Sequence, residues 1–256
     1  GIRDIERSRG LGDVYKRQTQ NLGEKIRQAR REKGMTHIVG PLGFTDLDRE
    51  GLLTFGFDEL GTMATNYNFP YYEEHVLGAG YQPDTEWLEF VMDVPDAIPE
   101  VMNRVADIVK RRFGLKVRKY TDKKAIKRDY GRALFELINE TYDQLYGYSP
   151  LTDRQIEAYI NEYLSLLDLD LVSLIVDRDE KLVGVGISMP SMSRALQKAK
   201  GKLFPFGWIP LLKGLKGKND RVDLLLVAVK PEYQSKGVNA LLFHCLLYTS
   251  PSPRDL

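Results

Sequence analysis

The sequence has one cysteine in its 256 residues, Cys245, which lies close to the C-terminal end. A single thiol cannot build a disulfide framework within the chain or a cysteine zinc site. The three histidines, His37, His75 and His244, are spaced too widely to form a metal-binding motif. A G-x-S-x-G motif and any other candidate for a catalytic triad are also missing. We therefore expect no disulfide, no metal site and no covalent catalysis by cysteine or serine.

An excess of one charge and a long apolar run are absent as well. Lys and Arg number 37 and Asp and Glu number 36, which gives a formal net charge of +1. This balance argues against a protein that holds nucleic acid by bulk positive charge. No apolar run approaches the ~20 residues that span a bilayer. These absences fit a cytoplasmic protein with one large or two modest globular units and no nucleic-acid partner.

The two ends of the chain are related at the level of DNA. A DNA sequence that encodes residues 245–255 has a complementary strand that encodes residues 8–18 in a shifted frame. That DNA resembles the transposase adapter used to prepare sequencing libraries, and residues 1–7 fit its outer part and a sample index. We therefore expect residues 1–18 and 245–256 to be adapter-derived, and residues 19–244 to be an internal piece of a longer protein. The alternative is a natural basic leader and a proline-rich tail.

The first part of the natural segment mixes helical and extended patterns. Residues 22–34 predict a helix, and residues 36–43 predict a short strand. Residues 85–95 predict a second strand, because polar and apolar side chains alternate there. Between them, the aromatic loop NYNFPYY (66–72) leads into a short helix. Aromatic residues at this density would line an acceptor pocket or an interdomain cleft, or, as is more common, form part of a core or an interface.

From residue 96 onward the expected elements follow one another regularly. In chain order these are a helix ending at Gly114, a strand at 115–121, helices at 123–147 and 151–167, a hairpin of two strands within 169–190, an insertion-like segment at 191–219, a strand at 221–231 and a further helix.

The turn after the last expected strand carries the most specific pattern, QSKGVN (234–239). A strand-to-helix turn presents unpaired backbone N–H groups, and the helix dipole favours negative charge there. Gly237 permits a backbone conformation that a Cβ would hinder, and Lys236 adds a positive charge. The pattern therefore favours a phosphate-binding turn, with an ordinary strand–turn–helix connection as the alternative.

With this turn and this order of elements, residues 115–243 resemble the first half of a domain of the GNAT superfamily of acyl-CoA N-acyltransferases. In that superfamily a Q/R-x-x-G-x-G/A loop after the fourth strand binds the pyrophosphate of acetyl-CoA. The departure is Asn239, where Gly or Ala is usual. Residues 22–95 resemble, more loosely, the second half of the same fold. The stretches IVGPLGFTDLDREGLL and KGKLFPFGW are also similar to uncharacterised bacterial members of the superfamily.

The resemblance implies an α/β (α+β) fold with two partial GNAT-like domains, each a mixed, mostly antiparallel sheet flanked by helices. We expect residues 19–95 to be the C-terminal half of a first domain. Residues 96–244 would be the N-terminal part of a second domain that carries the insertion at 191–219.

The resemblance also implies where a site would lie. Acetyl-CoA or another acyl-CoA would be the co-substrate, and a small-molecule or peptide amine would be the acceptor. Asp223 matches the acidic residue that often acts as general base, although it could equally be a solvated carboxylate at the start of a strand. The general acid is expected beyond residue 244. The residues expected to bind acyl-CoA are Leu226, Val227, Ala228, Val229, Gln234, Ser235, Lys236, Gly237, Val238 and Asn239.

We thus expect a fragment of an acyl-CoA-dependent N-acyltransferase, inactive in this truncated form, that transfers an acyl group such as acetyl to an amine. The alternative is a non-catalytic GNAT-like module that binds CoA or a partner. What separates the two is whether an acid on the fourth strand and a later tyrosine face the thioester.

The insertion-like segment holds seven basic residues and no acidic one, with Phe204, Phe206 and Trp208 among its lysines. Residues 191–218 could contact a membrane surface, cover an acyl chain as a lid, or hold the 3′-phosphate of CoA. We favour the plainer interpretation, a solvated helical hairpin whose aromatic side chains pack inward.

Overall fold

The computed structural model describes residues 23–43, 45, 47–216 and 219–249. The chain divides into two compact units, Gly1–Glu89 and Phe90–Leu256. The expected adapter-derived residues 1–18 lie outside the described residues, as do residues 250–256.

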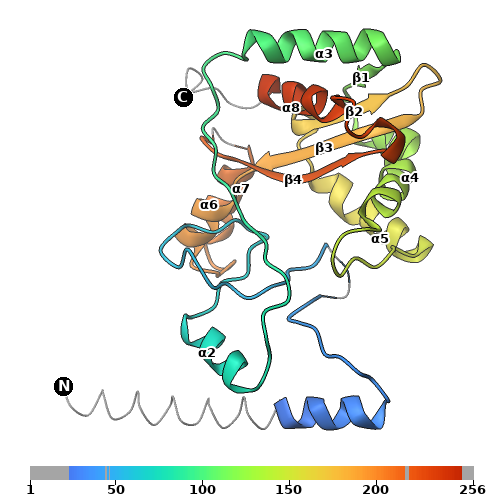
Figure 1. The fold of residues 1–256 in the computed structure, drawn as a ribbon. Coiled ribbons are helices and arrows are strands. Elements are labelled where there is room, and N and C mark those ends of the chain that lie inside the picture. Colours follow the sequence, from blue (N-terminus) through green and yellow to red (C-terminus); the bar gives the residue numbers. More distant parts are fainter. Residues whose placement is uncertain (1–22, 44, 46, 217–218, 250–256) are drawn as a thin grey trace. The chain divides into compact units, whose positions relative to one another are not determined.

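The second unit is built around a four-stranded sheet (Figure 1). Its strands are β1 (Lys116–Arg118), β2 (Val172–Val176), β3 (Leu182–Pro190) and β4 (Val222–Val229), and they pair in the order β1-β2-β3-β4. All three pairings are antiparallel. The chain is therefore of the mixed α/β class, as the sequence predicts.

The hairpin between β2 and β3 forms where the acidic turn predicts it. The carboxylate of Asp177 accepts hydrogen bonds from the backbone N–H groups of Asp179 and Lys181, each at 2.9 Å. This side chain closes the turn locally, so that the two buried strands can pair without any help from a distant segment.

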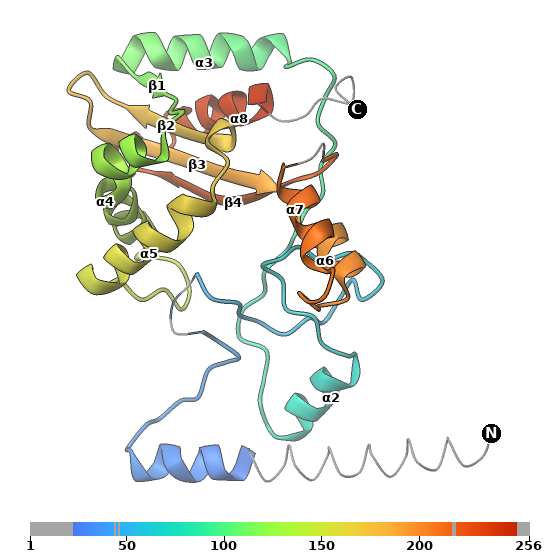
Figure 2. The same ribbon diagram turned by 180° about the vertical axis from the view of Figure 1, so that it is seen from behind.

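Helices cover both faces of this sheet (Figures 1 and 2). On one face lie α3 (Glu100–Phe113) and α8 (Val238–Thr249), and on the other lie α4 (Lys123–Tyr142) and α5 (Asp153–Leu166). The elements that remain are short: the 3₁₀ turns η1 (Leu169–Leu171) and η2 (Pro231–Tyr233), and the helices α6 (Ser193–Ala199) and α7 (Trp208–Lys216). Apolar side chains from both helical layers meet the sheet, which gives the unit its core.

The ends of these helices follow the capping signals in the sequence. Asp122 caps α4 by accepting a hydrogen bond from Lys124 N–H at 2.9 Å. Thr152 and Gln155 form a reciprocal capping box at the start of α5. Gly114 ends α3 with a φ of +66°, a left-handed conformation that glycine adopts without a steric penalty.

Helix α8 does not end at His244, where the sequence analysis places the end of natural sequence. It continues to Thr249, and Cys245 and Leu246 are buried against the sheet. The reason is helical spacing, because these residues continue the apolar face that begins with Val238, Leu241 and Leu242. Apolar residues in register extend a helix whatever DNA encodes them, so the adapter origin of this segment stays a prediction.

The first unit contains two helices among its described residues, one over residues 23–32 and α2 (Tyr71–Gly78). The strands predicted at 36–43 and at 85–95, a segment that continues into the second unit, are wrong, because neither pairs with another segment among the described residues. In the second of these, side chains on both alternating faces are exposed, including Leu88, Phe90 and Val91. An alternating pattern needs a neighbouring strand for its N–H and C=O groups before it becomes a sheet.

The aromatic loop at 66–72 does not form a core. Tyr67 and Phe69 are 65 % and 58 % exposed, and Phe69 stacks on Tyr71 with ring centroids 5.8 Å apart. Asn68 holds the loop by bonding the backbone of Leu53 in both directions, as acceptor at 2.7 Å and as donor at 3.0 Å. Asn66 adds a hydrogen bond to Gly51 O at 3.3 Å, so two asparagines hold this exposed row of aromatic side chains.

Candidate functional site

The connection from β4 to α8 is a tight turn that leads directly into the first turn of a helix. Gln234 has a φ of −64°, whereas Ser235 and Gly237 have φ values of +57° and +82°. Gln234 is thus extended, with a ψ of 154°, and two left-handed positions follow it just before the helix begins. Gly237 O accepts the hydrogen bond from Leu241 N–H at 3.3 Å. The N–H groups of the three residues between them therefore belong to the first helical turn, which lacks intrahelical acceptors.

Glycine is required at position 237 for two reasons. Its positive φ is unfavourable for a residue with a side chain, and a Cβ there would lie 3.0 Å from Cγ2 of Val109 on α3. Val238, the next residue, is completely buried and fixes the start of α8 in the core. The turn is thus held rigidly against α3 while its backbone N–H groups stay near the surface.

Positive side chains lie beside this turn. Lys236 Nζ lies 5.7 Å from the ring centroid of Phe113 and 5.8 Å from that of Tyr233. Arg112 also lies over the ring of Phe113, at 5.4 Å. Two cations held over aromatic rings therefore add positive charge on this side of the molecule.

One side of β4 is an open edge. Lys230 N–H donates to Val183 O at 2.8 Å, which marks a hydrogen-bonded pair of β3 and β4. Antiparallel pairs alternate, so Val229 and Val227 direct their N–H and C=O groups away from β3. Among the described residues no strand pairs with this edge.

Hydrogen bonds from two side chains confirm that the C=O groups of Val227 and Val229 point away from β3. The amide of Gln234 donates to Val229 O at 2.9 Å, and the hydroxyl of Tyr142 donates to Val227 O at 3.2 Å. Gln234 therefore ties the turn to the end of β4, a role that the sequence pattern alone does not reveal. Tyr142, at the end of α4, is a site residue that the sequence analysis missed, since the only signal was its place at the end of a long amphipathic helix.

Asp223 lies at the opposite end of β4 from the turn. It is half-buried and faces Met189 across the strand pair. The register slips between it and the rest of the strand, where Leu225 forms a β-bulge. Asp223 lies six positions before Val229, or roughly 20 Å at 3.3 Å per residue. The predicted base, Asp223, therefore lies at the start of β4, and the predicted binding residues 234–239 follow its end. The open edge of β4 runs between them.

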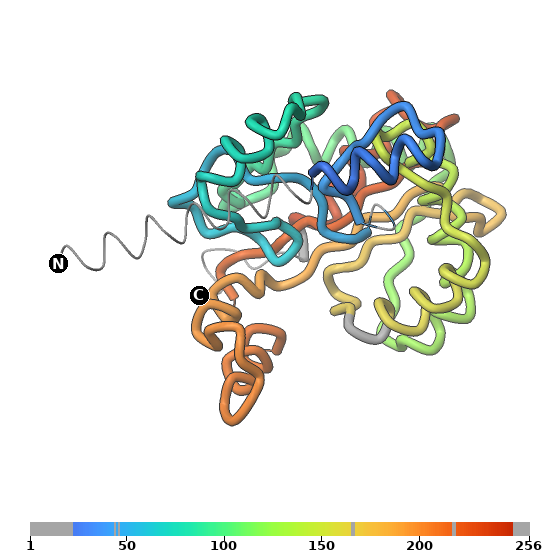
Figure 3. The backbone as a smooth tube through the Cα atoms, turned by 90° about the horizontal axis from the view of Figure 1, so that it is seen from below, coloured from blue at the N-terminus to red at the C-terminus, as the bar shows by residue number. Residues whose placement is uncertain are grey.

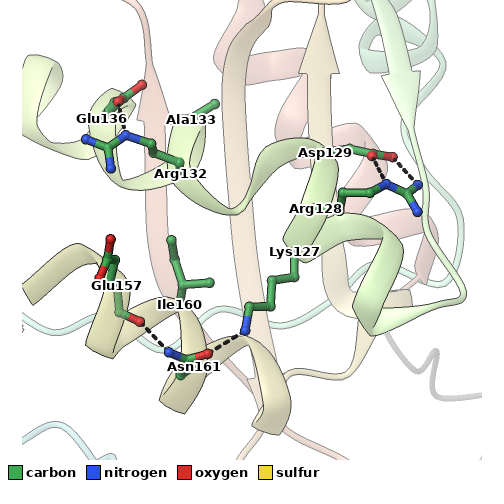
Figure 4. Close-up of a pocket in the computed structure, with 9 residues that line it drawn as sticks. All are labelled: Lys127, Arg128, Asp129, Arg132, Ala133, Glu136, Glu157, Ile160 and Asn161. Atoms are coloured by element: carbon green, nitrogen blue, oxygen red, sulfur yellow. Dashed lines mark hydrogen bonds and ion pairs between the residues drawn. The ribbon is translucent and has the colours of Figure 1, made fainter. Parts of the chain in front are cut away.

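A hollow of about 490 Å³ lies on the surface between α4 and α5 (Figure 4). Its charged side chains bind one another: Arg128 pairs with Asp129 at 2.8 Å, and Arg132 with Glu136 at 2.8 Å. Lys127 bonds to Asn161, which in turn donates to the backbone of Glu157. These pairings leave the hollow with little polar capacity for a ligand, and none of the predicted site residues lines it.

His244 is a structural residue of the helical layer. Its Nε2 lies 2.7 Å from Oδ1 of Asn103 on α3, and burial, followed by the nearby Lys110, lowers the pKa of the imidazole. Within the described part of the chain, no group of three or more histidine, cysteine or acidic residues could hold a metal ion. None of the described helices has the length and apolar character needed to cross a bilayer.

Comparison with known proteins gives two relatives and no match to a family model. The chain is 28% identical over 208 residues to a protein named bacterial ceramide synthase from Caulobacter vibrioides, covering 80% of this chain and 53% of the relative. It is 24% identical over 228 residues to Protein YghO of Escherichia coli, covering 87% of this chain and 56% of the relative. The chain therefore spans about half the length of the curated relatives it matches.

Proposed function

We propose that the chain is part of an acyl-CoA-dependent N-acyltransferase, with acyl-CoA bound along the open edge of β4 and at the turn into α8. The observation that carries the proposal is the tight turn with left-handed positions at Ser235 and Gly237, which leads directly into the first turn of α8. This arrangement fits a pyrophosphate, and Lys236 and Arg112 would add charge contacts.

The open edge suits the extended arm of CoA. An amide-containing chain can accept hydrogen bonds from the N–H groups of Val227 and Val229 along this edge. The arm would run from the turn toward Asp223, so that the thioester lies between the two ends of β4. Tyr142 and Gln234 already occupy the two carbonyl groups, which leaves the N–H groups of this edge as the donors for the arm.

In the proposed reaction the nitrogen of an amine attacks the thioester carbon, so that a C–N bond forms and the C–S bond breaks. Asp223 would take the proton that the amine loses, directly or through water. A backbone N–H of the open edge would stabilise the oxyanion. The CoA thiolate gains a proton as it leaves, from a general acid that we expect beyond residue 244.

The name of one relative supports this reaction class. A ceramide is an amide of a long-chain amine with a fatty acid, so a ceramide synthase forms the type of bond proposed here. For this chain the acceptor is proposed to be an amine. A long-chain amine joins small-molecule and peptide amines as a candidate acceptor.

Calorimetric titration of the chain with CoA tests the proposed site. Lys236→Glu should weaken binding about tenfold, which corresponds to about 1.4 kcal/mol, because a carboxylate would face the pyrophosphate. Lys124→Glu, an exposed substitution at the start of α4, serves as the matched control and should leave the affinity unchanged. No binding of CoA by the unmodified chain would overturn the proposal. Binding without release of CoA from acetyl-CoA or palmitoyl-CoA, when amines are supplied to the longer protein, would favour the non-catalytic module.

A further inference from the structure

The insertion between β3 and β4 folds as a separate helical hairpin, residues 193–216, which comprises α6, a connecting turn and α7. Figure 3 shows this hairpin, in orange, projecting from the sheet. Its base is closed by Asn219, whose amide donates to Ser191 O at 2.8 Å, and by the ion pair of Arg194 with Asp220 at 2.6 Å. Gly214 lets the two helices meet, because a Cβ there would lie 2.9 Å from Cβ of Ala195. The hairpin therefore folds as a unit of its own, and the contacts at its base attach it to the ends of β3 and β4.

The tip of the hairpin exposes its apolar side chains. Phe204 and Phe206 are 76 % and 70 % exposed, and Leu203 and Trp208 are about half exposed. The expectation that these aromatic side chains pack inward is therefore wrong. The physical reason is the size of the hairpin: two short helices that already contact each other at a glycine leave no interior large enough for three aromatic rings.

The turn that presents these side chains is held by its own hydrogen bonds. Trp208 N–H donates to Leu203 O and the indole N–H of Trp208 donates to Pro205 O, both at 3.1 Å. At Gly207 a Cβ would collide with the carbonyl oxygen of Lys202. The indole has thereby satisfied its polar group, so its apolar ring can enter a nonpolar medium without leaving a donor unpaired.

Positive charge surrounds the apolar tip. No acidic residue occurs between Ser191 and Asn219. Among the residues that the structure describes, the exposed lysines of the hairpin form no ion pair: Lys198, Lys200, Lys202, Lys213 and Lys216.

From these observations we propose that the hairpin docks on the surface of an anionic lipid bilayer, with its aromatic tip at the boundary between headgroups and acyl chains. Lys213 follows Trp208 by five residues on α7, or roughly 7 Å along the helix. This offset matches the depth of about 5–10 Å to which interfacial side chains enter a bilayer, so Lys213 would lie level with lipid phosphates. Leucine and phenylalanine at the tip fit acyl chains better than they fit the polar groups of a nucleic acid. The inference rests on the hairpin alone and does not depend on acyl transfer.

Flotation with lipid vesicles tests the proposal. The chain should float with vesicles of equal parts phosphatidylcholine and phosphatidylglycerol, and should float at least tenfold less with phosphatidylcholine alone. Phe204→Ser combined with Phe206→Ser should lower the bound fraction at least tenfold. Phe55→Ser, a change at a side chain that is 87 % exposed in the first unit, is the matched control and should have no effect.

The same flotation measurement tests the contribution of the lysines of the hairpin. Lys213→Glu with Lys216→Glu should abolish binding to anionic vesicles, whereas Lys25→Glu with Lys124→Glu changes the net charge equally and should not. Equal effects of the two pairs would show that binding follows overall charge and would overturn the proposal. So would equal binding to both kinds of vesicle, or release of the chain by an excess of single-stranded DNA at constant ionic strength.

A spectroscopic measurement avoids disruptive changes at the tip. The chain has two tryptophans, so Trp87→Phe leaves Trp208 as the single reporter. Its emission should shift to shorter wavelength when anionic vesicles are added, because the ring moves into a less polar medium. If the chain floats but this emission stays unchanged, another surface binds the lipid and the proposal fails.

Discussion

The two units of this chain use similar amino acids with opposite results. In the second unit, apolar residues at helical and strand spacing are buried, as Ile138 on α4 and Leu174 on β2 show. In the first unit Phe55 is 87 % exposed, and within the described residues every buried apolar side chain belongs to the second unit. The difference lies in partners, because each strand of the second unit has a neighbour that is supplied within the same unit. A sequence pattern therefore becomes structure only where its complementary face is present.

The largest expected effect is in the core. Ile138→Ala should lower the free energy of unfolding by about 2–5 kcal/mol, since it removes a fully buried side chain and leaves a cavity. Phe55→Ala, which removes a larger side chain from the first unit, should change it by less than about 0.5 kcal/mol. Urea unfolding followed by circular dichroism measures both. Comparable losses for the two variants would mean that the first unit has a core that buries Phe55, and would break the comparison.

Alanine substitutions at one glycine of each unit should give the next largest difference in stability. Gly237→Ala should destabilise the second unit by about 1–2 kcal/mol, because alanine at a φ of +82° is strained and its Cβ would press on Val109. Gly78→Ala, in α2 of the first unit, should instead stabilise by about 0.4–1 kcal/mol, since nothing lies within 4 Å of its Cβ position.

Thermal unfolding of the two glycine variants, beside the unmodified chain, decides this prediction. The transition should move to lower temperature for the first variant and to higher temperature for the second. A stabilising Gly237→Ala would contradict the tight packing of the turn against α3.

The smallest expected effect is electrostatic. Glu180, in the β2–β3 turn, accepts hydrogen bonds from Arg118 and Lys116 of β1, and these two cations lower its pKa to about 2. A carboxyl whose pKa falls on folding stabilises the fold above its unfolded pKa of 4.5, and the contribution is lost as the pH falls toward 2. Glu180→Gln should therefore destabilise the chain slightly at neutral pH and have no effect near pH 2.

Unfolding of the Glu180→Gln variant as a function of pH measures the contribution. Glu86→Gln, the same change at an exposed glutamate of the first unit, is the control and should leave the free energy of unfolding at neutral pH unchanged. A destabilisation by Glu180→Gln that stays the same down to pH 2 would show that the side chain acts through packing instead of charge.

The sequence predicts those parts of the fold whose signals are local. Thr152, predicted beside Asp153 as the N-cap, begins α5, Gly114 ends α3, and the acidic turn at 177–181 forms the hairpin. Each of these signals depends on a few adjacent residues. The extended segments at 36–43 and 85–95 could not be judged in this way, since a strand depends on a partner that the segment itself does not specify.

The same distinction between local and long-range signals applies to the candidate site. Gly237 and Lys236 could be read from the sequence, because a turn between strand and helix has a recognisable composition. Tyr142 could not, because its contact with Val227 O joins residues 85 positions apart. The exposure of the aromatic side chains on the hairpin could not be predicted either, because the amino-acid composition does not show how many side chains two short helices can bury.

The open edge of β4 has a consequence for the behaviour of the chain in solution. Leu224 and Leu225 on this strand are 45 % and 42 % exposed, next to N–H groups that point away from the sheet. Such an edge is a template for pairing with the same strand of a second copy. A ligand that lies along β4 would prevent such pairing of two copies. The fraction of the protein that stays monomeric would therefore increase when a ligand occupies the edge.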